Sequence, residues 1–97
     1  PVGLCAVKIE FDEAKRLKIL AECGLDLRGD PPEVFAGKHI EAEDNRKDYG
    51  EPRYRVWGFL RGRRVSLVWT PRGDARRIIT MRYAHEREQE SIFRLLD

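Results

Sequence analysis

Nine arginines lie between residues 53 and 82 of this 97-residue chain, and they are the side chains best suited to chemistry. The same stretch holds one acidic residue, Asp74, and no lysine. A planar guanidinium group matches two phosphate oxygens at once and keeps its charge at physiological pH. This composition therefore favours an anionic partner, although a solvated, arginine-rich sheet surface would show the same pattern.

The formal net charge of +2 hides an asymmetry between the two halves of the chain. Residues 1–52 hold 8 basic and 12 acidic side chains, a net charge of −4, whereas residues 53–97 hold 11 basic and 5 acidic ones, a net charge of +6. Such a division indicates a nucleic-acid or other polyanion surface on the basic half. The acidic half would then form the rim of that surface or meet a basic partner.

Groups that could act on RNA lie beside the arginines. Cleavage requires a base for the 2′-hydroxyl, an acid for the leaving oxygen, and cations near the developing negative charge. Glu51, Tyr83 and His85 lie close to the arginines in the sequence and could fill these roles. A salt-bridge role for Glu51 and a surface position for His85 are the alternatives. The aromatic side chains that could stack on bases, or else belong to the core, are Tyr54, Trp57, Trp69 and Tyr83.

A small α+β domain is predicted to position these side chains. Alternating apolar residues predict strands over 4–11, 38–43, 53–60, 64–70 and 76–83. Helices are predicted over 13–23, 32–36 and 85–96, the first beginning after an Asp12 N-cap and ending at Gly24. This order predicts a small antiparallel sheet packed on one face by the N- and C-terminal helices.

Arginines on the face left uncovered would form a basic plate. Strict alternation places Arg53 and Arg55 on one face of their strand. It places Arg76 with Arg82 on the last strand and Arg77 on the opposite side. One of these two sets is therefore expected to be partly buried or at an edge.

Length and composition favour a single cytoplasmic domain over residues 1–97. The apolar stretches are shorter than the roughly 20 residues that a membrane helix needs, and the apolar start lacks the basic region of a signal sequence. Cys5 and Cys23 lack metal-type spacing and are expected to be reduced and partly buried. We expect no metal and no cofactor.

Several short motifs resemble those of the BrnT toxins, in the same order and spacing over about residues 9–90. They are Phe11-Asp12-Glu13-Ala14-Lys15, Gly24-Leu25-Asp26, Asp48-Tyr49-Gly50-Glu51-Pro52-Arg53, Gly62-Arg63, Thr70-Pro71-Arg72-Gly73 and the segment 77–84. The resemblance implies a RelE-like fold and a metal-independent endoribonuclease acting on mRNA. It also implies a BrnA-like ribbon-helix-helix antitoxin as partner, with a toxin homodimer inside a toxin–antitoxin heterotetramer as the assembly to test.

The resemblance also suggests site residues. The catalytic candidates are Lys15, Glu51, Arg53, Arg77 and Arg82. Within this set, the three arginines would bind phosphate and stabilise the transition-state charge. Lys15 would contact the RNA backbone or shuttle a proton, and Glu51 would be the base. The candidates for RNA binding alone are Arg63, Arg72 and Tyr83.

The chain departs from the family pattern in the first helix. The family commonly has Asn and then Lys-His-Gly where this chain has Ile19 and Glu22-Cys23-Gly24. Either the missing Lys and His are dispensable, or the activity is altered; an apolar Ile19 also suggests a packed helix face. Two other hypotheses stay open. One is a non-catalytic basic module that docks RNA or an acidic protein, and the other is a basic homo-oligomeric domain.

Overall fold

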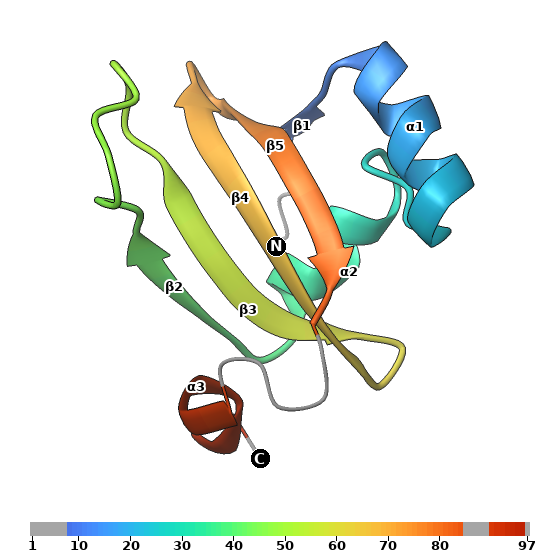
Figure 1. The fold of residues 1–97 in the computed structure, drawn as a ribbon, viewed down its shortest axis with the longest axis vertical. Helices are drawn as coiled ribbons and strands as arrows, with labels where there is room; N and C mark the ends of the chain where they lie inside the picture. The colour runs from blue at the N-terminus through green and yellow to red at the C-terminus, as the bar shows by residue number, and fades with distance from the viewer. Residues whose placement is uncertain (1–7, 85–89, 97) are drawn as a thin grey trace, which may run out of the picture.

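The computed structural model describes residues 8–84 and 90–96 (Figure 1). Its strands are β1 (Lys8–Glu10), β2 (His39–Glu43), β3 (Tyr54–Leu60), β4 (Arg63–Arg72) and β5 (Ala75–Tyr83). Its helices are α1 (Glu13–Cys23), α2 (Asp30–Ala36) and α3 (Glu90–Arg94). The predicted α+β class is confirmed. Residues 4–7 of the first predicted strand and residues 85–89 of the last predicted helix lie outside the described residues.

One five-stranded sheet has the order β1-β5-β4-β3-β2, and it differs from the predicted sheet in one respect. The pairs β2–β3, β3–β4 and β4–β5 are antiparallel, but β1 pairs with β5 in parallel, with Glu10 opposite Arg77. The sheet is therefore mixed rather than antiparallel throughout. Alternating apolar residues identify a strand but not its partner, and no short hairpin ties β1 to β5.

Helix α1 begins and ends where the sequence predicts. The Asp12 carboxylate accepts a hydrogen bond from the Lys15 backbone N–H at 3.2 Å. At the other end Gly24 has φ 73°, a left-handed conformation that suits glycine, and its N–H donates to the Leu20 carbonyl at 3.0 Å. Ile19 is the buried residue of α1, which confirms the packed helix face.

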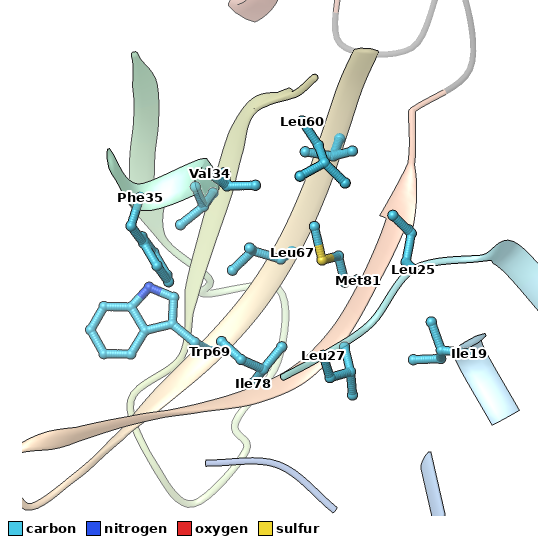
Figure 2. Close-up of a cluster of buried hydrophobic side chains, with 12 residues drawn as sticks. Ile19, Leu25, Leu27, Val34, Phe35, Leu60, Leu67, Trp69, Ile78 and Met81 are labelled. Carbon is cyan, nitrogen blue, oxygen red and sulfur yellow. The ribbon is translucent and has the colours of Figure 1, made fainter. Parts of the chain in front are cut away.

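The hydrophobic core lies between α1, α2 and one face of the sheet, here called the core face (Figure 2). Its fully buried side chains include Leu25, Leu27, Val34, Val56, Leu60, Val65, Leu67, Ile78 and Met81. Helix α2 lies close to β3: a Cβ built at Gly58 would be only 2.9 Å from Cγ1 of Val34. The absence of a side chain at Gly58 is what allows this contact.

A β-bulge in β5 changes which arginines share a face. Val68 pairs with Thr80 and the next residue, Trp69, pairs with Ile78, so Ile79 is an extra residue in the strand. Ile78 and Met81 consequently both lie in the core, 2% and 1% exposed, which strict alternation would forbid. The same shift moves Arg77 to the face of Arg82 and leaves Arg76 on the core face. The predicted grouping of Arg76 with Arg82 is therefore wrong.

Helix α3 lies against the sheet face opposite the core face, here called the second face. Phe93 is fully buried and its ring centroid lies 5.9 Å from that of Phe59. Arg64 adds an ion pair with Glu90 at 2.9 Å. The prediction placed both terminal helices on one face; the structure places α1 and α3 on different faces. Within the described ranges, no helix has the length and apolar character needed to cross a membrane.

Candidate active site

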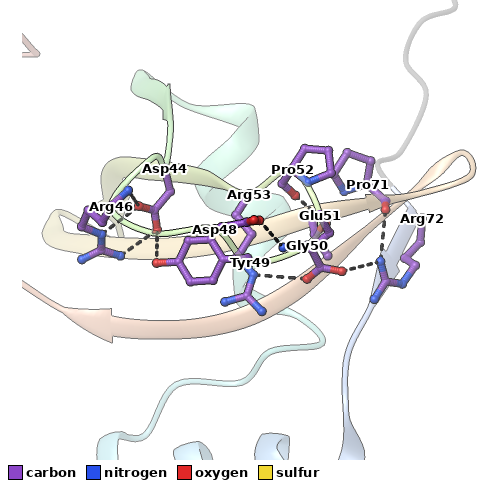
Figure 3. Close-up of polar contacts among 11 residues, drawn as sticks. Asp44, Arg46, Asp48, Tyr49, Gly50, Glu51, Pro52, Arg53, Pro71 and Arg72 are labelled. Carbon is purple, nitrogen blue, oxygen red and sulfur yellow. Dashed lines mark hydrogen bonds and ion pairs between the residues drawn. The ribbon is translucent and has the colours of Figure 1, made fainter.

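Glu51, Arg53 and Arg72 meet at one end of the sheet, although they come from different segments (Figure 3). The Glu51 carboxylate accepts from Nε of Arg53 at 3.2 Å and from a terminal nitrogen of Arg72 at 3.1 Å. Glu51 and Arg53 are partly buried, and Arg72 is more exposed. Two motifs that are 21 residues apart thus converge on one carboxylate.

The loop that carries Glu51 is organised by Asp44 at its start. The Asp44 carboxylate accepts from Arg46 at 2.8 and 2.7 Å and from the Tyr49 hydroxyl at 3.2 Å. Its backbone N–H donates to the carbonyl of Arg53 at 2.7 Å, which closes the loop at its base. Arg46 holds the pKa of the Asp44 carboxyl far below its usual range.

A tight turn then directs Glu51 toward the sheet. The Asp48 carboxylate accepts from the Gly50 N–H at 2.9 Å, and Gly50 has φ 72°. An Asx turn followed by a glycine at positive φ reverses the chain within three residues. The Arg53 guanidinium lies 4.1 Å from the centroid of the Tyr49 ring. Asp48, Tyr49, Gly50 and Arg53 of this motif therefore each have a structural reason for their residue type.

Thr70 links this cluster to Arg77. The fully buried Thr70 hydroxyl donates to the carbonyl of Pro52 at 2.7 Å, and Thr70 is the register partner of Arg77. Because directly paired residues point to the same face, Arg77 lies beside the segment that carries Glu51 and Arg53. We call the set Glu51, Arg53, Arg72 and Arg77 the arginine corner.

Lys15 approaches the arginine corner from α1. Asp12, Lys15 and Arg77 line a cavity of about 320 Å³ together with Ile78 and Ile79. Arg77 also pairs with Glu10 at 3.6 Å. Lys15 and Arg77, two of the predicted catalytic residues, thus share one cavity.

The other candidates lie farther away. Arg82 is on the second face, paired with Ser66, four residues along β4 from Thr70. At about 3.3 Å per residue this places it roughly 13 Å from Arg77. Arg63 and Tyr83 lie on the core face, where the guanidinium sits 3.8 Å from the ring centroid. They contact each other and are not brought to the arginine corner.

Trp69 and Tyr54 take the core role, one of the two that the sequence left open for them, and one expectation, the partial burial of Cys23, is wrong. The predicted stacking residues include Trp69, which is 8% exposed, stacks on Tyr54 with centroids 4.9 Å apart and donates to Glu41 at 2.9 Å. These rings build the core face rather than an RNA platform. Cys23 is free but exposed, not partly buried. The structure also gives roles to Asp44, Tyr49 and Thr70, which were not among the predicted site residues. Tyr49 and Thr70 stand in the quoted motifs, whereas Asp44 lies in the polar, turn-rich segment 44–52.

The carboxylate of the arginine corner is held between two guanidinium groups, those of Arg53 and Arg72. Arg72 first and Arg53 second lower the pKa of the Glu51 carboxyl. Glu51 is therefore ionised at neutral pH and weakly basic. Among the described residues, no three side chains of His, Cys, Asp or Glu converge closely enough to hold a metal ion.

The fold and the site define a small α+β domain with a cluster of arginines around one carboxylate at the end of a mixed sheet. A family model described as "Ribonuclease toxin, BrnT, of type II toxin-antitoxin system" matches residues 11–88. The chain belongs to this BrnT family, as the motifs predicted. A search of curated proteins found no match. Membership implies an antitoxin partner and an RNA target.

Proposed function

We propose that this chain is a metal-independent endoribonuclease that cleaves mRNA and that a BrnA-like antitoxin neutralises it. The observation that carries the proposal is the convergence of Glu51, Arg53 and Arg72, with Arg77 next to them across Thr70. Preorganised guanidinium groups stabilise the negative charge that develops on a phosphate under attack. Family membership supports RNA as the polymer that carries this phosphate.

The reaction is an internal transfer within the RNA. The 2′-oxygen attacks the adjacent phosphorus and loses its proton to a base, while the bond from phosphorus to the 5′-oxygen breaks and that oxygen gains a proton. The products are a 2′,3′-cyclic phosphate and a 5′-hydroxyl. Arg53 and Arg77 stabilise the doubly charged phosphorane oxygens. Lys15 donates to the leaving oxygen, because it shares the cavity of Arg77.

Glu51 is the carboxylate of the arginine corner and accepts the 2′-proton in this scheme. Its lowered pKa makes it a poor general base, since efficiency is greatest when the pKa lies near the working pH. Its larger contribution is to hold Arg53 and Arg72 in place through its two ion pairs. We therefore propose that Glu51 acts mainly as a positioning residue.

The departures in α1 are compatible with an active corner. Glu22 and Cys23 are exposed at the C-terminal end of α1, whereas Lys15 lies in its first turns. Seven residues of helix separate Lys15 from Glu22, roughly 10 Å along the axis. The side chains that replace the family Lys-His therefore lie away from the proposed reacting groups.

The direct test is cleavage of a labelled single-stranded RNA in excess EDTA. Wild-type protein should produce fragments with cyclic phosphate ends, and Arg53→Ala and Arg77→Ala should not. Arg94→Ala is the matched control, because Arg94 is an exposed α3 residue paired only with Glu90 among the described residues. Salt-sensitive RNA binding without fragments would favour the non-catalytic binding module instead. Fragments that vanish with EDTA would contradict metal independence.

The partner proposal has its own test. We propose that the antitoxin is a small ribbon-helix-helix protein that meets the toxin in the cytoplasm, with two toxin chains in a heterotetramer. Co-expression of the two chains, followed by light scattering of the purified complex, measures the stoichiometry. A complex of any other composition, or toxicity that the antitoxin does not relieve, would contradict this assignment.

A further inference from the structure

Strand β2 is an edge of the sheet whose outer side meets no other strand of residues 8–84 and 90–96 (Figure 1). The Asp44 N–H donates to the Arg53 carbonyl at 2.7 Å, at the end where β2 pairs with β3. In an antiparallel pair, every second residue turns both of its backbone groups toward the partner strand. Asp44 and Ala42 therefore face β3, whereas Glu41 and Glu43 turn their backbone N–H and C=O groups outward.

The side chains of these two outward residues carry negative charge that is still available. Glu41 and Glu43 are exposed, and their register partners Val56 and Tyr54 place both on the core face. Oε1 of Glu41 accepts from Nε1 of Trp69 at 2.9 Å. The Glu43 carboxylate makes no hydrogen bond or ion pair with any residue that the structure describes. A strand added outside β2 would therefore meet outward backbone groups and two carboxylates on one face.

The opposite edge of the sheet, β1, offers less to a partner strand. β1 has three residues, whereas β2 has five. The charged side chains of β1 are already paired, Lys8 with Asp74 at 2.7 Å and Glu10 with Arg77 at 3.6 Å. Short edge strands are one way in which proteins prevent strand addition. Of the two edges, β2 is therefore the one suited to an added strand.

A second copy of this chain fits the β2 edge poorly. Antiparallel pairing of two β2 strands about Glu41 would set the two Glu41 carboxylates opposite each other, and pairing about Ala42 would set Glu41 opposite Glu43. Pairing about Ile40 would set Glu43 opposite Gly37, which lies outside β2. Like charges directly opposite each other destabilise a sheet, whereas opposite charges stabilise it. The edge therefore favours a foreign strand with basic side chains.

The position of β2 indicates which partner supplies that strand. The Glu43 end of β2 leads into the loop that carries Glu51, and the hydrogen bond between Asp44 and Arg53 closes this loop next to the arginine corner. A chain docked along β2 therefore leaves the edge beside the proposed catalytic groups, which a neutralising partner has to reach. Family membership implies such a partner, an antitoxin.

We propose that the β2 edge docks an extended segment of the antitoxin that carries Lys or Arg at alternate positions. This docking rests on the antitoxin partner proposed above and does not depend on RNA cleavage. Main-chain hydrogen bonds supply the affinity of strand addition, and alternate side chains supply its specificity. The basic side chains lie opposite Glu41 and Glu43 on the core face. The residues between them lie beside Ile40 and Ala42 on the second face, where apolar side chains fit.

The first measurement follows the backbone amides of the full chain by NMR during titration with blocked peptides, up to about 1 mM. The peptide Lys-Val-Arg-Val-Lys alternates basic and apolar residues, and its control Lys-Lys-Arg-Val-Val has the same composition without alternation. The alternating peptide should shift the amides of Glu41 and Glu43 and bind about fivefold more tightly than the control, as two cross-strand ion pairs provide. Equal affinities, absent shifts, or shifts that avoid β2 would overturn the proposal.

Substitutions at Glu43 separate the backbone contribution from the charge. Glu43→Pro removes an outward N–H as well as the carboxylate and should weaken peptide binding about tenfold, the value of one hydrogen bond and one ion pair. Proline is tolerated there because the Glu43 N–H does not serve the β2–β3 pair. Glu43→Lys reverses the charge alone and should weaken binding about fivefold. Glu22→Lys, the same charge reversal at an exposed position of α1, should leave binding unchanged.

The second measurement tests the assignment of this edge to the antitoxin. The Kd of the purified toxin–antitoxin complex should rise about tenfold with Glu43→Pro, and an unchanged Kd would overturn the assignment. Urea midpoints check that each variant folds, and Glu43→Lys carries both tests if Glu43→Pro does not fold. RNA cleavage in EDTA tests the ribonuclease separately, because Glu43 lies outside the arginine corner. Either proposal can therefore fail while the other stands.

Discussion

Arginines on the two faces of the sheet come from one short stretch of sequence but have different surroundings. On the core face, the Arg76 guanidinium lies 4.4 Å from the Phe35 ring centroid and 4.7 Å from that of Trp69. In the arginine corner, Arg53 and Arg72 share the Glu51 carboxylate. The first arrangement covers aromatic surface, and the second holds charge at a partly exposed site. The number of arginines in a segment therefore says little until each is assigned to a face.

The adjacent pair Arg76 and Arg77 gives the strongest test of this comparison. Arg77→Ala should lower the single-turnover rate of RNA cleavage by about 10²–10³-fold, as loss of one preorganised charge donor does elsewhere. Its free energy of unfolding should barely change, because its pair with Glu10 is at the surface. Arg76→Ala should keep the cleavage rate and lose about 1 kcal/mol of stability through its aromatic contacts. Equal effects of both variants on cleavage would remove the distinction between the faces.

A substitution at Asp44 tests how much the loop that carries Glu51 contributes to the free energy of unfolding. Asp44→Asn removes the charge that Arg46 and Tyr49 contact and should lower the free energy of unfolding by about 2 kcal/mol at pH 7. The folded-state pKa is depressed, so this stabilisation is complete above the unfolded-state pKa of about 3.9 and is lost as the pH falls below it. Urea denaturation from pH 7 to pH 3 measures both effects. The difference between the wild type and the variant should shrink below pH 4; a constant difference would contradict the assignment.

Two substitutions at Glu51 distinguish a positioning role of this carboxylate from a role in proton transfer. Glu51→Gln keeps one of the two oxygens and can accept from one of Arg53 and Arg72, so it should lower kcat by only a few-fold, whereas Glu51→Ala keeps neither and should lower it about tenfold. The wild-type rate should not fall as the pH drops from 7 to 5, because the lowered pKa keeps Glu51 charged there. Single-turnover pH profiles of all three proteins provide the measurement. If Glu51→Gln loses as much as Glu51→Ala, proton transfer rather than positioning is the main contribution of the carboxylate.

Much of the fold could be predicted from local patterns, because local physics decides those features. The N-cap at Asp12 and the left-handed Gly24 fix α1, and alternation identifies β3 to β5. The parallel pairing of β1 and the bulge at Ile79 depend on contacts between distant segments, and alternation contains no sign of them. That single extra residue decides which of Arg76 and Arg77 faces the corner.

The site could be predicted only in part for the same reason. The motifs indicated Glu51, Arg53, Arg72 and Arg77, which the structure brings together. They also indicated Arg63 and Tyr83, which pack against each other on the core face. A motif records that a residue type is needed at a position, and it does not distinguish packing from chemistry.

The salt dependence of RNA binding compares an arginine of the second face with one of the core face, and the expected effect is the smallest of those predicted. Binding of single-stranded RNA releases counterions, so log K falls with log[salt] with a slope of about −0.7 for each phosphate neutralised. Arg82 is exposed on the second face, and Arg82→Ala should make this slope shallower by about 0.7. Arg63 is stacked on Tyr83, and Arg63→Ala should leave the slope unchanged. Fluorescence anisotropy between 50 and 300 mM salt, at about 50 nM labelled RNA, resolves a change of this size. A shallower slope for Arg63→Ala, with none for Arg82→Ala, would mean that RNA binds along the core-face edge, because only a side chain that neutralises phosphate changes the number of ions released.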